Sequence, residues 1–152
     1  MPGPAKPSLT IKRHFLAPPA LVFTAWTEPR HMMAWWATKD AVTLLAESDL
    51  RIGGRYRVIF KTPDGESHDV SGVYREVEPP EKLVMSWAWA TTPERESQVT
   101  LLFRPDGAGT SLILKHEFFF DEEARDNHNR GWTEALDNLE RFAADNAGSK
   151  RS

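Results

Sequence analysis

The sequence predicts an α+β fold in which one curved sheet of seven antiparallel strands wraps around a long C-terminal helix. The first observation is the order of the expected elements: a strand, two short helices, six strands and a long helix. The second is apolar and polar alternation interrupted by short turns, which indicates an antiparallel meander. The third is an apolar period of about 3.6 residues near the C-terminus, which is typical of an amphipathic helix.

The N-terminal segment "MPGPAKP" is rich in Pro and Gly, which predicts disorder over residues 1–7. A strand is expected next, in "SLTIKRHFLA". Its residues Leu9, Ile11 and Arg13 alternate with Thr10, Lys12 and His14. This period of two residues places Leu9, Ile11 and Arg13 on one face of the strand.

Two short helices are expected after this strand. The pair Pro18-Pro19 suits a helix start, where a missing N–H costs nothing. Pro29 ends this helix and opens a second one, which is expected to run through Ala37. Met32, Trp35 and Trp36 would then share a helical face.

Six strands are expected in the middle of the chain, joined by turns that contain Gly or Pro. In the turn "TPDGES", Asp64 and Gly65 are expected to supply the positive backbone angles of a hairpin. The remaining turns lie at Gly53-Gly54 and in "EPPEK", "TTPERE" and "RPDGAG". The expected strands occupy residues 41–52, 55–60, 68–77, 83–90, 97–103 and 110–119.

A long helix is expected after Asp121, a plausible N-cap, and acidic residues fill its first turn. The predicted domain covers residues 8–146, and residues 147–152 are expected to fray. This helix should cover the concave face of the sheet and leave a gap that forms a natural pocket. Its apolar stripe consists of Ala124, His128, Trp132, Ala135, Leu136, Leu139 and Phe142/Ala143.

Composition narrows the class of protein. A chain of 152 residues fits one domain, and a net charge of -3 implies no basic face for nucleic acid. The absence of Cys excludes thiol catalysis and fits a reducing compartment. With neither a signal peptide nor an apolar run of about 18 residues, we expect a cytoplasmic protein with no membrane span.

Several motifs carry a family resemblance: "IKRHFLAPPALVFTAWTEPRHMMAWWA", "DLRIGGRYR", "SGVYREVEPPEKLVMSWAW", "VTLLF", "LILKHEFF" and "HNRGWTEALDNL". Together they resemble the activator-of-heat-shock-protein-90-ATPase-homologue family of the START/birch-pollen-allergen-like (SRPBCC) superfamily, over residues 8–144. The resemblance implies a helix-grip fold with a hydrophobic cavity. Superfamily members include ligand carriers, cyclases, hydrolases and a co-chaperone domain, so the fold does not choose among these functions.

Aromatic residues are the main candidates for a binding site. Met85, Trp87 and Trp89 share one strand face, which would form either a pocket wall or ordinary core. Adjacent helix residues point about 100° apart. One of Trp35 and Trp36 is therefore expected to face the cavity mouth and the other the sheet edge. The predicted pocket lining is Trp35, Trp36, Met85, Trp87, Trp89, His116, His128 and Trp132.

Two histidines are the polar candidates. His116 shares a strand face with Leu112 and Leu114, and His128 lies one helical turn before Trp132. Inside an apolar cavity they could orient a carboxylate or phenol, or act as acid and base. They could equally be hydrogen-bonded structural histidines.

The predicted function is the binding of an unidentified hydrophobic or amphipathic small molecule between the sheet and the long helix. One alternative is a cyclase- or hydrolase-type enzyme that uses His116, His128 or a pocket carboxylate such as Glu117. Another is a co-chaperone-like protein-interaction module. No cofactor is expected, and no metal, because the His spacing matches no metal-binding motif. The apolar segment "HMMAWWA" suggests a homodimer through this region or an edge strand.

Overall fold

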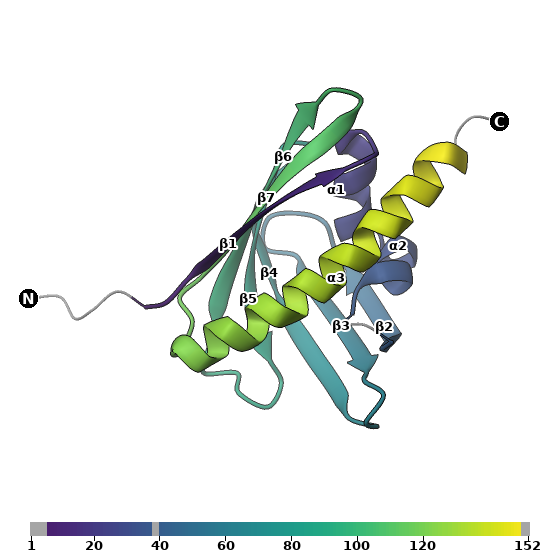
Figure 1. The fold of residues 1–152 in the computed structure, drawn as a ribbon. Coiled ribbons are helices and arrows are strands. Elements are labelled where there is room, and N and C mark those ends of the chain that lie inside the picture. The colour runs from purple at the N-terminus through teal and green to yellow at the C-terminus, as the bar shows by residue number, and fades with distance from the viewer. Residues whose placement is uncertain (1–5, 38–39, 150–152) are drawn as a thin grey trace, which may run out of the picture.

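The computed structural model describes residues 6–37 and 40–149, and its elements follow the predicted order (Figure 1). The seven strands form one antiparallel sheet in the order β1-β7-β6-β5-β4-β3-β2, which confirms the predicted fold class. Of the segment predicted to be disordered, residues 1–5 lie outside the described residues. The elements are β1 (Leu9–Phe15), α1 (Pro19–Thr27), α2 (Pro29–Trp35), β2 (Val42–Ser48), β3 (Arg55–Lys61), β4 (Ser67–Glu78), β5 (Lys82–Trp89), β6 (Ser97–Asp106), β7 (Gly109–Glu117) and α3 (Glu122–Ser149).

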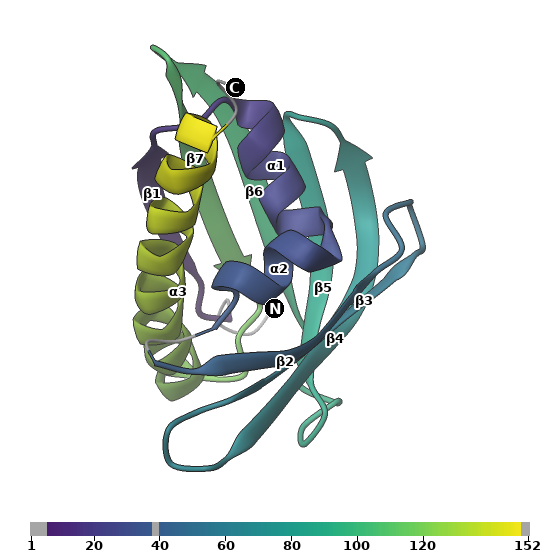
Figure 2. The ribbon, with the colours of Figure 1, turned by 90° about the vertical axis from the view of Figure 1, so that its right-hand side faces the viewer.

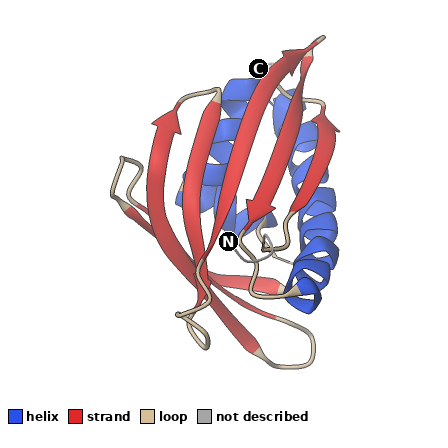
Figure 3. Cartoon of the chain, turned by 90° about the vertical axis from the view of Figure 1, so that its left-hand side faces the viewer, coloured by secondary structure: helices blue, strands red, loops and turns tan. Residues whose placement is uncertain are grey.

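All three helices of the described residues lie on one side of the sheet. Figure 2 shows α1, α2 and α3 within the curve of the strands, and Figure 3 shows the strands from outside with the helices behind them. β1 closes the order by pairing with β7, so β1 and β2 are the two sheet edges. None of these helices is both long and apolar enough to cross a membrane.

Two turns differ from the sequence expectation. In the β3–β4 turn Gly65 alone has a positive φ, of 89°. The Asp64 carboxylate instead accepts hydrogen bonds from the Thr62 hydroxyl and the Glu66 N–H, which holds the turn without a positive angle at Asp64. β7 ends at Glu117 rather than at residue 119, because Phe118 has a φ of 68° and leaves the extended conformation.

α2 is shorter than predicted. It ends at Trp35, and Trp36 has an extended backbone whose N–H donates to the Met32 carbonyl. Trp36 is also held from outside the helix, because its own carbonyl accepts a hydrogen bond from the Thr43 hydroxyl on β2. The two tryptophans are therefore not neighbours on one helix, and both are buried.

α3 begins as predicted, because the Asp121 side chain accepts a hydrogen bond of 2.8 Å from the Ala124 N–H. Its apolar stripe faces the sheet, with Trp132, Leu136 and Leu139 buried. The helix runs to Ser149, past the predicted domain boundary at residue 146, and residues 150–152 lie outside the described residues.

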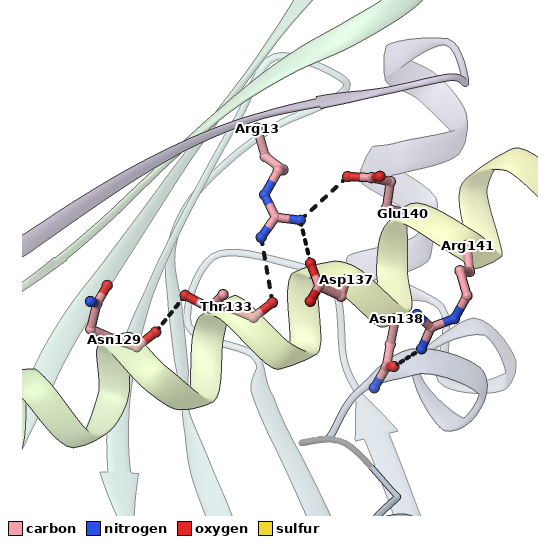
Figure 4. Close-up of polar contacts among 7 residues, drawn as sticks. All are labelled: Arg13, Asn129, Thr133, Asp137, Asn138, Glu140 and Arg141. Carbon is pink, nitrogen blue, oxygen red and sulfur yellow. Dashed lines mark hydrogen bonds and ion pairs between the residues drawn. The ribbon is translucent and has the colours of Figure 1, made fainter.

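An ion-pair cluster ties the edge strand β1 to the second half of α3 (Figure 4). Arg13 donates to Asp137 at 2.9 Å, to Glu140 at 3.3 Å and to the Thr133 carbonyl at 3.4 Å. The predicted alternation in β1 places Arg13 on the face of Leu9 and Ile11, so this side chain reaches the helix. The sheet thus holds α3 by charge at its β1 edge as well as by apolar packing.

Candidate ligand-binding cavity

A cavity of about 510 Å³ lies between the sheet and the first half of α3. This volume suits a small organic molecule. The apolar lining residues are Trp36, Ala37, Phe60, Trp87, Trp89, Ala90, Gly131, Trp132 and Ala135. The polar lining residues are Thr62, Ser67, His68, Asp69, Thr91, Thr92, Asn127 and His128. β3, β4, β5, α3 and the segment after α2 therefore all contribute to one space.

The two short helices cover the part of the concave face that the cavity does not occupy. α1 packs against β6, β7 and α3, while α2 packs against β2 and α3 (Figure 2). Side chains of α1 such as Val22 and Trp26 are fully buried there. Beyond the reach of these helices, side chains of the strands, of α3, of the segment after α2 and of the turn after β5 surround the cavity.

Tryptophan rings form the wall. The rings of Trp36 and Trp87 stack at 6.0 Å with an angle of 14° between their planes. Trp89 stands perpendicular to Trp87, at 89°, and Trp132 lies 5.0 Å from Trp87. Trp87 is thus the centre of an aromatic wall that comes from three separate segments of the chain.

Three predicted lining residues, Trp35, Met85 and His116, lie outside the cavity. The Trp35 indole packs on Trp26 and donates a hydrogen bond of 2.8 Å to the Ala25 carbonyl, so it belongs to the core beneath α1. Met85 shares a strand face with Trp87, as predicted. It lies nearer the start of β5, where the hydrophobic core fills the concave surface. The alternation of apolar and polar residues in β5 predicted which face points inward. It did not predict where along the strand the cavity ends.

His116 is fully buried behind the wall and does not line the cavity. The Trp132 indole N–H donates to its Nδ1 at 3.0 Å, and the Ser97 hydroxyl lies 2.7 Å from its Nε2. An indole nitrogen can only donate, so Nδ1 is the acceptor and the ring proton sits on Nε2. The same ring packs on Phe119 at 4.2 Å. His116 is therefore fixed as a neutral structural histidine.

His128 lines the cavity and is also fixed as a neutral ring. Its Nδ1 donates to the Ala124 carbonyl at 2.7 Å, and its Nε2 accepts the Trp89 indole N–H at 2.9 Å. Each of the two histidines thus holds one wall tryptophan in place. The two imidazole rings meet at 5.1 Å.

Burial lowers the pKa of both histidines. For His116, desolvation lowers the pKa well below its ordinary value, and the nearby His128 lowers it further. For His128, desolvation lowers the pKa while the hydrogen bond to the Ala124 carbonyl partly opposes the shift. Both shifts agree with the hydrogen-bond geometry, which requires each ring to accept from an indole.

The contact between Ser97 and His116 has the spacing of a nucleophile and its base, but the wrong proton arrangement. A serine nucleophile must donate its proton to an unprotonated ring nitrogen. Here Nδ1 accepts from Trp132, so Nε2 carries the proton and donates to Ser97. The Ser97 hydroxyl in turn points to the Trp87 carbonyl, at 3.4 Å. This pair supports the wall and is not arranged to activate the hydroxyl.

Glu117 does not act as a pocket carboxylate. It follows the inward-facing His116 on β7, so its side chain points away from the cavity, and it forms an ion pair with Lys115 at 3.4 Å. It lines neither cavity of the described residues. Those residues also contain no group of three or more His, Asp or Glu side chains that could hold a metal ion.

The rim includes polar residues that were absent from the sequence prediction. His68 stacks on Phe60 at 5.1 Å, and its Nε2 lies 3.2 Å from the Thr62 hydroxyl. That hydroxyl donates to Asp64, so a chain of hydrogen bonds fixes the His68 ring. The sequence could have predicted this pair. Strands paired about the predicted hairpin turn place His68 opposite Phe60.

A smaller cavity of about 180 Å³ adjoins the first, beside the β5–β6 turn and the start of α3. Trp87, Trp89 and His128 line both cavities. The hydrogen bond between Trp89 and His128 therefore lies in the partition between them. Arg95, which covers the Phe120 ring at 3.8 Å, lines the smaller cavity.

These features define a class: a helix-grip domain whose sheet and long helix enclose an aromatic cavity. The family model described as "Activator of Hsp90 ATPase homolog 1-like protein" matches residues 16–144. This chain belongs to that family, as its motifs suggested. No curated protein sequence matches the chain significantly.

Solved bacterial structures share the fold. A protein from Chromobacterium violaceum superposes with a TM-score of 0.82 at 24% identity, over 90% of this chain and 96% of that one. The AHSA1 protein from Silicibacter pomeroyi gives 0.80 at 26% identity, over 91% and 98%. An AHSA1-like protein from Aeromonas hydrophila gives 0.78 at 24% identity, over 96% and 97%.

Proposed function

We propose that this protein binds a hydrophobic or amphipathic small molecule, in the cytoplasm, in the cavity between the sheet and α3. The observation that carries the proposal is the enclosure of about 510 Å³ by four tryptophans, Trp36, Trp87, Trp89 and Trp132. Large aromatic side chains normally fill a core. Here hydrogen bonds from two of their indoles to histidines hold the rings around a space.

The distribution of polar groups supports an amphipathic ligand. Trp36, Trp87 and Trp132 are buried parts of the lining, whereas the polar lining residues Thr62, His68 and Asn127 are more exposed. A binding site typically combines a mainly apolar wall with a few polar groups that orient the ligand. The apolar part of the ligand would lie against the indoles and its polar part near this second set.

The enzyme alternative receives less support from the geometry. Its candidate base His116 lies outside the cavity and both its ring nitrogens are engaged. His128 lines the cavity, but its Nε2 is already accepting the Trp89 N–H. A base needs a free nitrogen within reach of the reacting group, and neither ring offers one in this arrangement.

One observation still supports a protein-interaction role. The segment "HMMAWWA" no longer suggests an interface, since Met32, Trp35 and Trp36 are buried in the core. Edge strand β2, however, exposes Val42 and Leu44. The homodimer stays a prediction for this edge, and analytical ultracentrifugation at high protein concentration would contradict it by showing only monomer.

Titration with N-phenylnaphthylamine, an uncharged dye that fluoresces in apolar surroundings, tests the binding proposal. We expect saturable binding at one site. Ala135→Met should block the site, because Ala135 lines the cavity and a longer side chain would occupy it. Ala34→Met, at an exposed position on α2, is the control and should bind like the parent. Absence of saturable binding, or unchanged binding in a folded Ala135→Met variant, would contradict the proposal.

A further inference from the structure

The cavity lining is almost free of formal charge. Among the lining residues that the structure describes there is no Lys, Arg or Glu, and the one acidic residue is Asp69. A cavity that binds an acid normally supplies a cation or several N–H donors for it. The lining therefore lacks the groups that bind an acid, in addition to being hydrophobic.

Asp69 directs its charge away from the cavity. Its carboxylate is bound at two points by Arg57, with distances of 3.1 Å from Nε to Oδ1 and 2.8 Å from Nη2 to Oδ2. The next residue on β4, Val70, is fully buried among the inward-facing residues. Because successive strand residues point to opposite faces, Asp69 points outward with Arg57.

Two of the three histidines at the cavity, His116 and His128, provide no positive charge. His128 accepts the Trp89 indole N–H, and His116 behind it accepts that of Trp132. Protonation of either accepting nitrogen would break the bond to its tryptophan. Both rings therefore stay neutral as long as the wall is intact.

Among the described residues, the arginines closest to the lining are engaged by other side chains. Asp64 and Glu66 are exposed in the β3–β4 turn next to His68. Arg130 donates to the neutral Asn127 amide, and Arg95 of the smaller cavity stacks on the Phe120 ring. His68 is linked to the Asp64 carboxylate through the Thr62 hydroxyl.

We propose that the site takes an uncharged amphipathic molecule, such as an alcohol, ketone, ester or amide, and discriminates against the anion of the same skeleton. This inference rests on the proposed binding function. An anion that enters must give up its hydration and meets no Lys or Arg side chain among the described lining residues, whereas a neutral polar group loses far less.

Two dyes that share one skeleton test the inference. Anilinonaphthalene sulfonate has the anilinonaphthalene rings of N-phenylnaphthylamine and adds a permanent negative charge. Displacement of bound N-phenylnaphthylamine by the sulfonate reports on the cavity alone, whatever other surface the sulfonate contacts. We expect the sulfonate to bind at least about tenfold more weakly than the uncharged dye, since its charge is desolvated without a partner.

A variant with an added cation checks that charge is the cause. Ala90 is exposed in the turn after β5 and lines the cavity, so Ala90→Lys should raise the affinity for the sulfonate several-fold relative to the affinity of the same variant for the neutral dye. Ala108, an exposed alanine in the β6–β7 turn, lies outside the lining, and Ala108→Lys should change neither affinity.

The outcomes separate the two proposals. Equal affinities of the parent protein for both dyes would overturn the charge inference and leave the binding function standing. Failure of both dyes to bind would overturn both. Equal gains in Ala90→Lys and Ala108→Lys would show a general effect of net charge and would also overturn the inference.

Discussion

The two halves of α3 face the same sheet with the same apolar period, yet one half packs solidly and the other borders a cavity. In the second half, Leu136, Leu139 and Ala143 are buried within the hydrophobic core. In the first half, Asn127, His128 and Trp132 line the open space. The stripe of a helix thus shows which face is covered, but not whether the covering is complete.

The difference arises from what the rest of the chain places opposite each half. α1 supplies small and aromatic side chains that fill the space near the second half, and Arg13 ties that half to β1. Opposite the first half, rigid tryptophan rings pack on one another, and hydrogen bonds to His128 and His116 hold Trp89 and Trp132. A wall fixed in this way stays open without the support of a filled core.

The largest expected effect on stability belongs to the packed half. Leu139→Ala removes a fully buried side chain and should lower the free energy of unfolding by about 3 kcal/mol, while the folded variant binds N-phenylnaphthylamine like the parent. Denaturant unfolding and dye titration measure the two effects. A loss below about 1 kcal/mol would mean that this half is as loosely filled as the other.

A substitution in the half that borders the cavity should change dye binding more than one in the packed half. Trp87→Ala removes the central ring of the wall and should weaken dye binding by as much as about 3 kcal/mol. Circular dichroism must first show that the variant is folded, and Trp87→Phe, which keeps a ring, should lose less. A folded Trp87→Ala variant with the affinity of the parent would remove the distinction between the halves.

The pH dependence of stability tests the neutral histidines. In the unfolded chain they take up protons below their ordinary pKa of 6.5, whereas their lowered pKa values keep them neutral in the folded protein. Stability should therefore be unaffected by these groups above that pH and should fall as the pH decreases below it. The slope approaches about 1.4 kcal/mol per pH unit for each histidine.

His116→Gln, which removes this titrating group, should flatten the slope relative to the parent. Urea unfolding at a series of pH values measures it. A slope in His116→Gln equal to that of the parent would show that His116 does not resist protonation in the folded state.

The smallest effect is expected at the ion-pair cluster. Arg13→Ala removes its contacts with Asp137 and Glu140 (Figure 4), which are partly exposed to solvent. The loss of stability should be below about 1 kcal/mol and should shrink in high salt. A larger loss, independent of salt, would mean that the packed half depends on this cluster more than on its apolar contacts.

The sequence was sufficient for the fold because repeating patterns report which face is buried. Alternation placed Trp87 and Trp89 on the concave face, and the helical period placed His128 and Trp132 opposite them. These four cavity residues follow from local pattern alone. The strand register set by the turn around Gly65 would also have predicted Phe60 and His68 as lining residues.

The remaining features depend on contacts between distant segments. α2 ends at Trp35, and the next residue, Trp36, stacks on Trp87 of β5. No residue pattern near Trp35 predicts this helix end. His116 was correctly placed on the inward face, but its partners Ser97 and Trp132 come from other elements. Which nitrogen is protonated, and hence whether His116 can act as a base, cannot be inferred from sequence spacing.

The most direct test of the account follows the indole N–H signals of the six tryptophans by ¹H–¹⁵N NMR as N-phenylnaphthylamine is added. The account predicts that the signals of Trp36, Trp87, Trp89 and Trp132 shift together, because these residues line the cavity. The signals of Trp26 and Trp35, which lie in the packed core, should stay in place and serve as internal controls. Shifts centred on Trp26 and Trp35, or no shifts at saturating dye, would contradict a binding cavity at the first half of α3.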